Sequence, residues 1–191
     1  ASFTKDARAL AHNGYVYLAG GVGTGGFAQN SVGYSRINAD GTLAGWNFTS
    51  SMTVARSGFA LGVCNGYLVA ASGPYANTEM APIGSSGELG PWRTDQLSEP
   101  EGRSDCGSAW FNNRLYITGG DYAGAPQKTV EYAAMQAAGP LGNYLTSPTS
   151  LVNRMNHGAI AWNGYLYVIG GHTDVANALL TASVNYTSIN P

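Results

Sequence analysis

The sequence carries little charge. Only 10% of its 191 residues are Asp, Glu, Lys or Arg, against about a quarter in an average soluble protein. The nine Lys and Arg residues are scattered along the chain and the formal net charge is −2. A nucleic-acid-binding protein needs a basic patch that neutralises phosphates, so we expect no nucleic-acid partner.

Long apolar runs are also missing. No run approaches the roughly 20 residues of a membrane-spanning helix, and no basic and apolar signal segment opens the chain. We therefore expect no membrane insertion. Ala1 is compatible with a signal that has been removed, and the low charge and many hydroxyl side chains favour an extracellular or cell-surface protein.

The chain has two cysteines, Cys64 and Cys106, too few for a disulfide-rich scaffold or a metal cluster. Aligned on the repeat described below, they lie five strand positions apart, about 16 Å, which is beyond disulfide reach. We predict two free or separately buried thiols.

Signals for catalysis are lacking as well. His12, His157 and His172 belong to no local Cys/His motif, so the sequence predicts no metal site. It has no GxxxxGK[ST] phosphate loop and no GxSxG elbow. The eleven Asp and Glu residues are dispersed, so nothing supports an acid/base pair. We predict no catalytic residue and no cofactor.

What the sequence does have is a repeat. The phrases "NGYVYLAGGV", "NGYLVAASGP", "NNRLYITGGD" and "NGYLYVIGGH" begin at Asn13, Asn65, Asn112 and Asn163, in steps of 52, 47 and 51 residues (65−13, 112−65, 163−112). A period near 50 residues is typical of a propeller repeat. Each unit predicts four strands, with an Asn-Gly hairpin turn between the first two. The fold prediction is therefore a single all-β domain of about four blades, with units at approximately 1–52, 53–99, 100–150 and 151–191.

Further marks recur in phase. They are the glycine pairs Gly20-Gly21, Gly119-Gly120 and Gly170-Gly171, the degenerate pair Ser72-Gly73, the tyrosines Tyr34, Tyr132 and Tyr186, and the tryptophans Trp46 and Trp92. With these marks the chain resembles kelch-repeat β-propellers over essentially its whole length. The resemblance implies that the first strand of each unit is innermost, that the Trp-bearing strand is outermost, and that the protein acts by interaction. The copper-binding residues of the related galactose-oxidase group cannot be matched here.

The predicted inner strands carry small residues at Ala9, Gly62, Ser108 and Ala159, as expected close to a crowded axis. The larger residues at their turn ends are His12, Cys64, Phe111 and Trp162. We expect these four to fill space between blades rather than to form a ligand site.

The fourth unit reaches Pro191 before its outer strand. Three interpretations follow: a segment of a larger propeller, a chain that completes a ring with a second copy, or a small ring whose last blade has three strands. The first two are favoured, because an open arc would expose apolar faces that normally find a partner.

Two sets of residues are candidates for ligand binding. Arg56, Arg103 and Arg154 recur at the entry to the inner strand, either as a ring for an anionic ligand or as hydrogen-bond donors to loop carbonyls. The variable loops after the glycine pairs carry Tyr75, Asp121, Tyr122 and His172, a mixture that suits stacking on a sugar ring or gripping a peptide.

We therefore expect a non-enzymatic binding or scaffold propeller that recognises a protein or a glycan through rim loops. The alternatives are a carbohydrate-active enzyme or oxidase of the galactose-oxidase type, and a structural module of a larger assembly.

Overall fold

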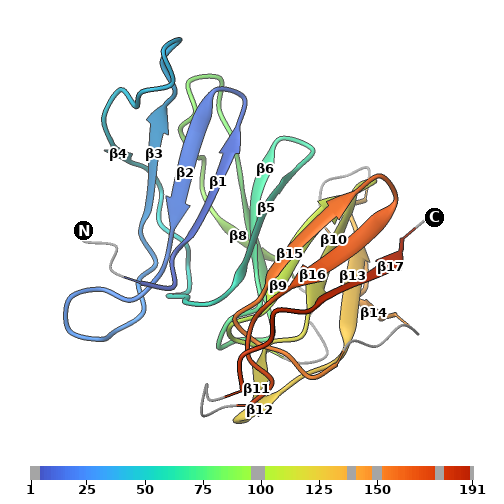
Figure 1. Cartoon of the computed structure of the whole chain (residues 1–191). Coiled ribbons are helices and arrows are strands. Elements are labelled where there is room, and N and C mark those ends of the chain that lie inside the picture. Colours follow the sequence, from blue (N-terminus) through green and yellow to red (C-terminus); the bar gives the residue numbers. More distant parts are fainter. Residues whose placement is uncertain (1–4, 96–101, 137–140, 148–151, 175–178, 190–191) are drawn as a thin grey trace.

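The computed structural model describes residues 5–95, 102–136, 141–147, 152–174 and 179–189. Over these residues the chain is all-β, and no helix that could cross a membrane is found in them. The predicted unit boundaries at 99/100 and 150/151 lie outside the described residues. The fold is a four-blade β-propeller, with four small antiparallel sheets arranged side by side around a common axis (Figure 1).

Each sheet is formed from one repeat of the sequence and is called a blade. Blade 1 contains β1 (Arg8–His12), β2 (Tyr15–Ala19), β3 (Val32–Arg36) and β4 (Asn47–Phe48). Blade 2 contains β5 (Ala60–Cys64), β6 (Tyr67–Ala71), β7 (Thr78–Pro82) and β8 (Arg93–Asp95). Blade 3 contains β9 (Gly107–Phe111), β10 (Arg114–Thr118), β13 (Val130–Ala134) and β14 (Leu145–Thr146). Blade 4 contains β15 (Gly158–Trp162), β16 (Tyr165–Ile169) and β17 (Val184–Ser188). A two-stranded hairpin, β11 (Asp121–Tyr122) and β12 (Ala125–Pro126), projects from blade 3.

The hairpin turns confirm the sequence prediction. Both turn residues have positive φ in every blade, for example 46° at Asn13 and 79° at Gly14, as a two-residue hairpin turn with these residues requires. The register then pairs all five residues of the first strand with the second, from His12 opposite Tyr15 to Arg8 opposite Ala19 in blade 1. The edge of the propeller that carries these turns is called the turn rim, and the opposite edge, with the glycine pairs, the glycine rim.

The first strands of neighbouring blades, β1, β5, β9 and β15, lie against one another in turn, which confirms their innermost position. The core consists of three apolar clusters, each between two neighbouring blades. The cluster between blades 1 and 2 includes Tyr17, Phe59 and Leu68. The clusters between blades 2 and 3 and between blades 3 and 4 are centred on Leu115 and on Leu166.

Cys64 and Cys106 are both buried and are not joined by a disulfide, as predicted. Cys64 Sγ lies 2.8 Å from Asn113 Oδ1 and Cys106 Sγ lies 3.8 Å from the Gly58 carbonyl oxygen. Cys64 and Phe111 also fill space between blades, as expected. Trp162 does not: its side chain is 70% exposed, because the face of blade 4 on which it lies has no described blade packed against it.

Candidate functional site

The three recurring arginines are fully buried and bind groups of their own blades. In each blade the guanidinium donates to the backbone carbonyl at the first position of the glycine pair: Arg56 Nη1 to Ser72 O (2.5 Å), Arg103 Nη1 to Gly119 O (3.1 Å) and Arg154 Nη1 to Gly170 O (2.9 Å). An acidic or amide side chain completes the contact, namely Glu79, Glu131 and Asn185.

The same arginines also join neighbouring blades. The backbone carbonyls of Arg56 and Arg154 accept hydrogen bonds of 2.8 Å from the second glycine of the preceding blade, Gly21 and Gly120. Contacts within and between blades give these arginines a structural role, which the sequence offered as the alternative to a ligand ring. The first unit has Thr4 at the corresponding position, outside the described residues.

The four loop candidates lie on the glycine rim, spread over three blades. Tyr75 of blade 2 and Tyr122 of blade 3 are exposed by 52% and 43%. Asp121 begins β11 and exchanges backbone hydrogen bonds with Ser104. His172 pairs in the same way with Met155 of its own blade. Residues 175–178 of the same loop lie outside the described residues. The four side chains thus belong to one rim but come from separate loops.

A cavity of about 200 Å³ lies near the axis, lined by residues at or just before the start of the inner strands, among them Arg8, Ser108 and His157. The Arg8 side chain crosses between blades, donating from Nε to Phe59 O (2.6 Å) and from Nη2 to Cys106 O (3.1 Å). Arg8 therefore connects blade 1 to blades 2 and 3, and two of its N–H donors are used in hydrogen bonds to backbone carbonyls.

The histidine in this cavity is neutral at physiological pH. His157 Nε2 lies 2.8 Å from Thr118 Oγ1. Burial, with smaller contributions from the positive charges of Arg154 and Arg8, lowers the pKa of His157 to about 4. An uncharged histidine bound to a threonine suits a packing role, and the cavity takes its positive charge from Arg8.

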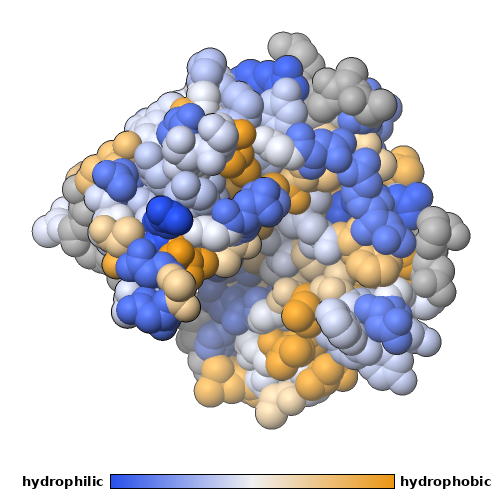
Figure 2. Space-filling view, turned by 90° about the horizontal axis from the view of Figure 1, so that it is seen from above, coloured by the Kyte–Doolittle hydropathy of each residue, from blue (hydrophilic) through white to orange (hydrophobic). Residues whose placement is uncertain are grey.

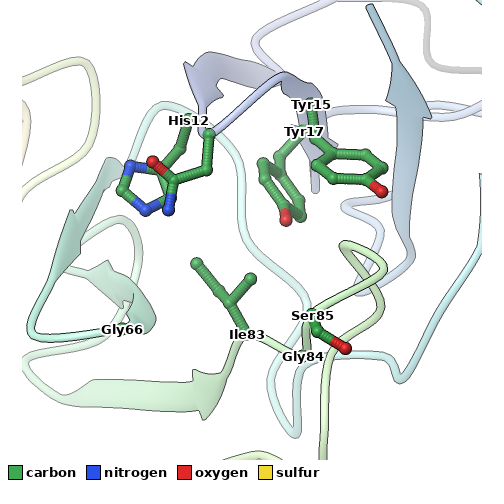
Figure 3. Close-up of a pocket in the computed structure, with 8 residues that line it drawn as sticks. His12, Tyr15, Tyr17, Gly66, Ile83, Gly84 and Ser85 are labelled. Carbon is green, nitrogen blue, oxygen red and sulfur yellow. The ribbon is translucent and has the colours of Figure 1, made fainter.

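A second cavity, of about 230 Å³, opens on the turn rim between blades 1 and 2 (Figure 3). Its wall includes His12 on one side, Tyr15 and Tyr17 on the other, and Ile83 with Ser85 from the facing loop. The sequence reasoning missed this site, because its residues come from two repeats and each belongs to the recurring strand and turn pattern.

Two tyrosines of that cavity contact the turn at Gly87. Tyr17 is fully buried and its hydroxyl donates to Gly87 O at 3.0 Å. Burial, with a smaller contribution from Tyr15, raises the pKa of Tyr17 to about 12, so the hydroxyl stays protonated. A Cβ on Gly87 would lie 2.6 Å from Tyr15 Cδ1, so the Tyr15 ring rests directly on this glycine. The cavity is therefore preformed, with one aromatic wall and polar groups around it.

In the part of the chain that the structure describes, no group of three or more His, Cys, Asp or Glu side chains could hold a metal ion. A search of protein-family models and a search of curated proteins each found no match to the chain.

Proposed function

We propose that this protein is a non-enzymatic binding propeller that takes a protein or glycan ligand on its rim. The observation that carries the proposal is the preformed cavity on the turn rim between blades 1 and 2 (Figure 3). Ligand sites are commonly concave, with apolar walls and a few polar groups, and rigid β-scaffolds present such sites at the ends of their strands.

The wall of this cavity suits a sugar ring or a single peptide side chain. Tyr15 and Ile83 offer apolar surface for the apolar face of a sugar or for an aliphatic group. His12, Asn13 and Ser85 bring donors and acceptors for hydroxyl or amide groups. The volume of about 230 Å³ is below that of drug-sized pockets, which favours a terminal sugar or one side chain over an extended ligand.

The glycine rim is the second candidate surface for the same function. Its exposed aromatic residues, Tyr75 and Tyr122, would provide stacking surface, with Asp121 and His172 on neighbouring loops. The two rims lie at opposite ends of the strands, so variants on one leave the other intact.

We also propose that the chain is a kelch-like propeller that works outside the cell or on its surface. Support for the kelch relationship comes from the in-phase glycine pairs, which have positive φ throughout the described copies, for example 62° at Gly20 and 90° at Gly21. Support for the location comes from the low charge of the sequence. The competing proposal is an enzyme or oxidase that acts on carbohydrate.

The test is binding of the purified chain to a glycan array and to a peptide library. Ser85 is exposed and lines the cavity, so Ser85→Tyr should block it and weaken binding by at least about tenfold. Ser86→Tyr is the matched control, because Ser86 is exposed in the same turn but does not line the cavity.

If both variants lose binding equally, or if neither loses binding, the turn-rim cavity is not the binding site. Loss in Tyr75→Ala and Tyr122→Ala instead would move the function to the glycine rim. Turnover of a bound glycan would favour the enzyme.

A further inference from the structure

Blade 4 has one apolar face with no described residue packed over it. We call the face of blade 4 that points away from blade 3 its front face. It consists of every second residue of the three strands. These are Gly158, Ile160, Trp162, Tyr165, Tyr167, Ile169, Val184, Tyr186 and Ser188. None is charged, and Trp162 and Tyr186 are exposed by 70% and 68%. An apolar surface of this kind marks an interaction site, and Figure 2 shows hydrophobic surface gathered beside a hollow in the molecule.

The corresponding face of every other blade is buried by the next blade. In blade 1 it carries Tyr17 and Ala19, which belong to the cluster shared with blade 2. In blade 2 it carries Val69 and Met80, in the cluster shared with blade 3. In blade 3 it carries Tyr116, in the cluster shared with blade 4. The front face of blade 4 is thus one half of an interface between blades, and no described blade supplies the other half.

Blade 1 has its opposite face uncovered by the described residues. Ala9 and Ala11 on β1 are exposed, and Val16 and Leu18 on β2 are partly exposed. We call these four the back face of blade 1. In the other blades, the residues that correspond to Val16 and Leu18 are buried against the preceding blade. They are Leu68 and Ala70 in blade 2, Leu115 and Ile117 in blade 3, and Leu166 and Val168 in blade 4. The back face of blade 1 is therefore the missing half of the same kind of interface.

The two free faces fit each other by size. Between blades 2 and 3, a large residue on the back face fills the space over a glycine on the front face: a Cβ on Gly62 would lie 1.4 Å from Trp110 Nε1. The positions that correspond to Gly62 and Trp110 are Ile160 in blade 4 and Ala11 in blade 1. Here the large residue is on the front and the small one on the back, so this contact again pairs one large residue with one small residue, as close packing favours.

A polar contact would follow the same pattern. In blade 1 the Tyr17 hydroxyl donates to Gly87 O, in the turn between the third and fourth strands of blade 2. Tyr167 occupies the Tyr17 position in blade 4. Gly41 occupies the Gly87 position in blade 1: both have φ of 83°, and both donate to the carbonyl three residues earlier. Nothing lies within 4 Å of a Cβ built on Gly41, so this turn is free to receive a tyrosine.

We propose that the front face of blade 4 binds the back face of blade 1 in a second copy of this chain, with the Tyr167 hydroxyl donating to Gly41 O of that copy. Such a contact is head to tail. A pair of copies joined by one such contact therefore keeps one uncovered face at each end, unless the two copies close into a ring. Two copies related by a twofold axis along the propeller axis use both faces of both chains. This proposal does not rest on ligand binding by either rim.

The first experiment measures the mass of the chain in solution by sedimentation or light scattering. The expected result is twice the chain mass of 19.8 kDa. A monomer at all accessible concentrations would overturn the proposal.

The second experiment separates the two faces. Trp162→Glu spoils the front face and Ala11→Arg spoils the back face, and each variant alone should be monomeric. Mixed in equal amounts they should associate as one-to-one pairs, because each contributes the face that the other has lost. Phe27→Glu is the control: Phe27 is 77% exposed in a loop away from both faces, so this variant should keep the wild-type mass.

Two further outcomes would overturn the proposal. If Ala11→Arg stays dimeric while Trp162→Glu does not, two front faces bind each other and the contact is not head to tail. If the two variants are folded by circular dichroism but their mixture stays monomeric, the two faces do not bind each other.

Discussion

At the scale of single residues, the buried arginines connect the glycine pairs to the blades. Arg56 Nε donates to Glu79 Oε1 at 3.0 Å, and both side chains are fully buried. Glu79 also accepts hydrogen bonds from the backbone and hydroxyl of Thr53. A buried pair of this kind is costly to break, because removing one partner leaves an uncompensated charge.

We therefore expect Arg56→Ala to lower the free energy of unfolding by about 3–5 kcal/mol. Urea titration followed by circular dichroism measures the change. Arg36→Ala is the control: Arg36 is exposed on β3, so its removal should change stability by less than about 0.5 kcal/mol. Equal effects of the two variants would contradict the structural role assigned to Arg56.

His157 predicts a pH dependence. Its pKa is about 4 in the folded chain, against 6.5 as the reference value. Between these values the unfolded chain binds more protons, so the folded state loses stability as pH falls from 6.5 to 4 and keeps its full stability above 6.5. The loss should reach about 3 kcal/mol, at 1.36 kcal/mol per pKa unit.

His157→Gln should therefore flatten the fall in unfolding free energy between pH 6.5 and pH 4, measured by urea titration at several pH values. A wild-type slope in His157→Gln would show that the carboxylates, not His157, set the acid sensitivity.

At the scale of strands, the packing of β5 on β9 depends on a glycine, Gly62, which leaves room for the side chain of Trp110. A Cβ on Gly62 would overlap the Trp110 indole, so Gly62→Ala should cost about 1–3 kcal/mol or more by overpacking. Combining it with Trp110→Leu should recover part of that loss. Gly158→Ala is the control, because a Cβ there meets only Ile169 O, at 3.8 Å. Thermal unfolding of the three variants measures these effects, and no recovery in the double variant would contradict direct contact between Gly62 and Trp110.

The strands themselves were predictable because the signals are local. Asparagine followed by glycine adopts the positive φ of a hairpin turn with little regard to the rest of the chain, and the observed turn at Asn163 and Gly164 has φ of 48° and 78°. The residues of the cavity in Figure 3 were not predictable in this way. His12 and Ser85 are 73 positions apart (85−12), and only the packing of blade 1 on blade 2 brings them to one wall.

At the scale of the whole molecule, the exposed surface is uneven. Blade 2 is covered on both faces by its neighbours, and four of the five residues of β6 are buried. The described residues cover blade 4 on one face only, and β17 alternates between exposed and partly buried residues. With a net charge of only −2, electrostatic repulsion does little to oppose contact between copies. The proposed association of blade 4 with blade 1 is the consequence at this scale.

The sequence by itself determined the all-β class, the four repeats and the hairpin turns, because these depend on local φ preferences and on a pattern repeated four times. The innermost position of the first strands was an expectation from the resemblance to kelch repeats, which the contacts between those strands then confirmed. The tertiary structure alone decided which residues meet across blades. It buried Arg56, Arg103 and Arg154 inside their own blades, formed the rim cavity, and left the tyrosines and Trp162 of blade 4 exposed. The reason is physical: a strand pattern records that a face is apolar, whereas its burial depends on the neighbouring blade that packs against it.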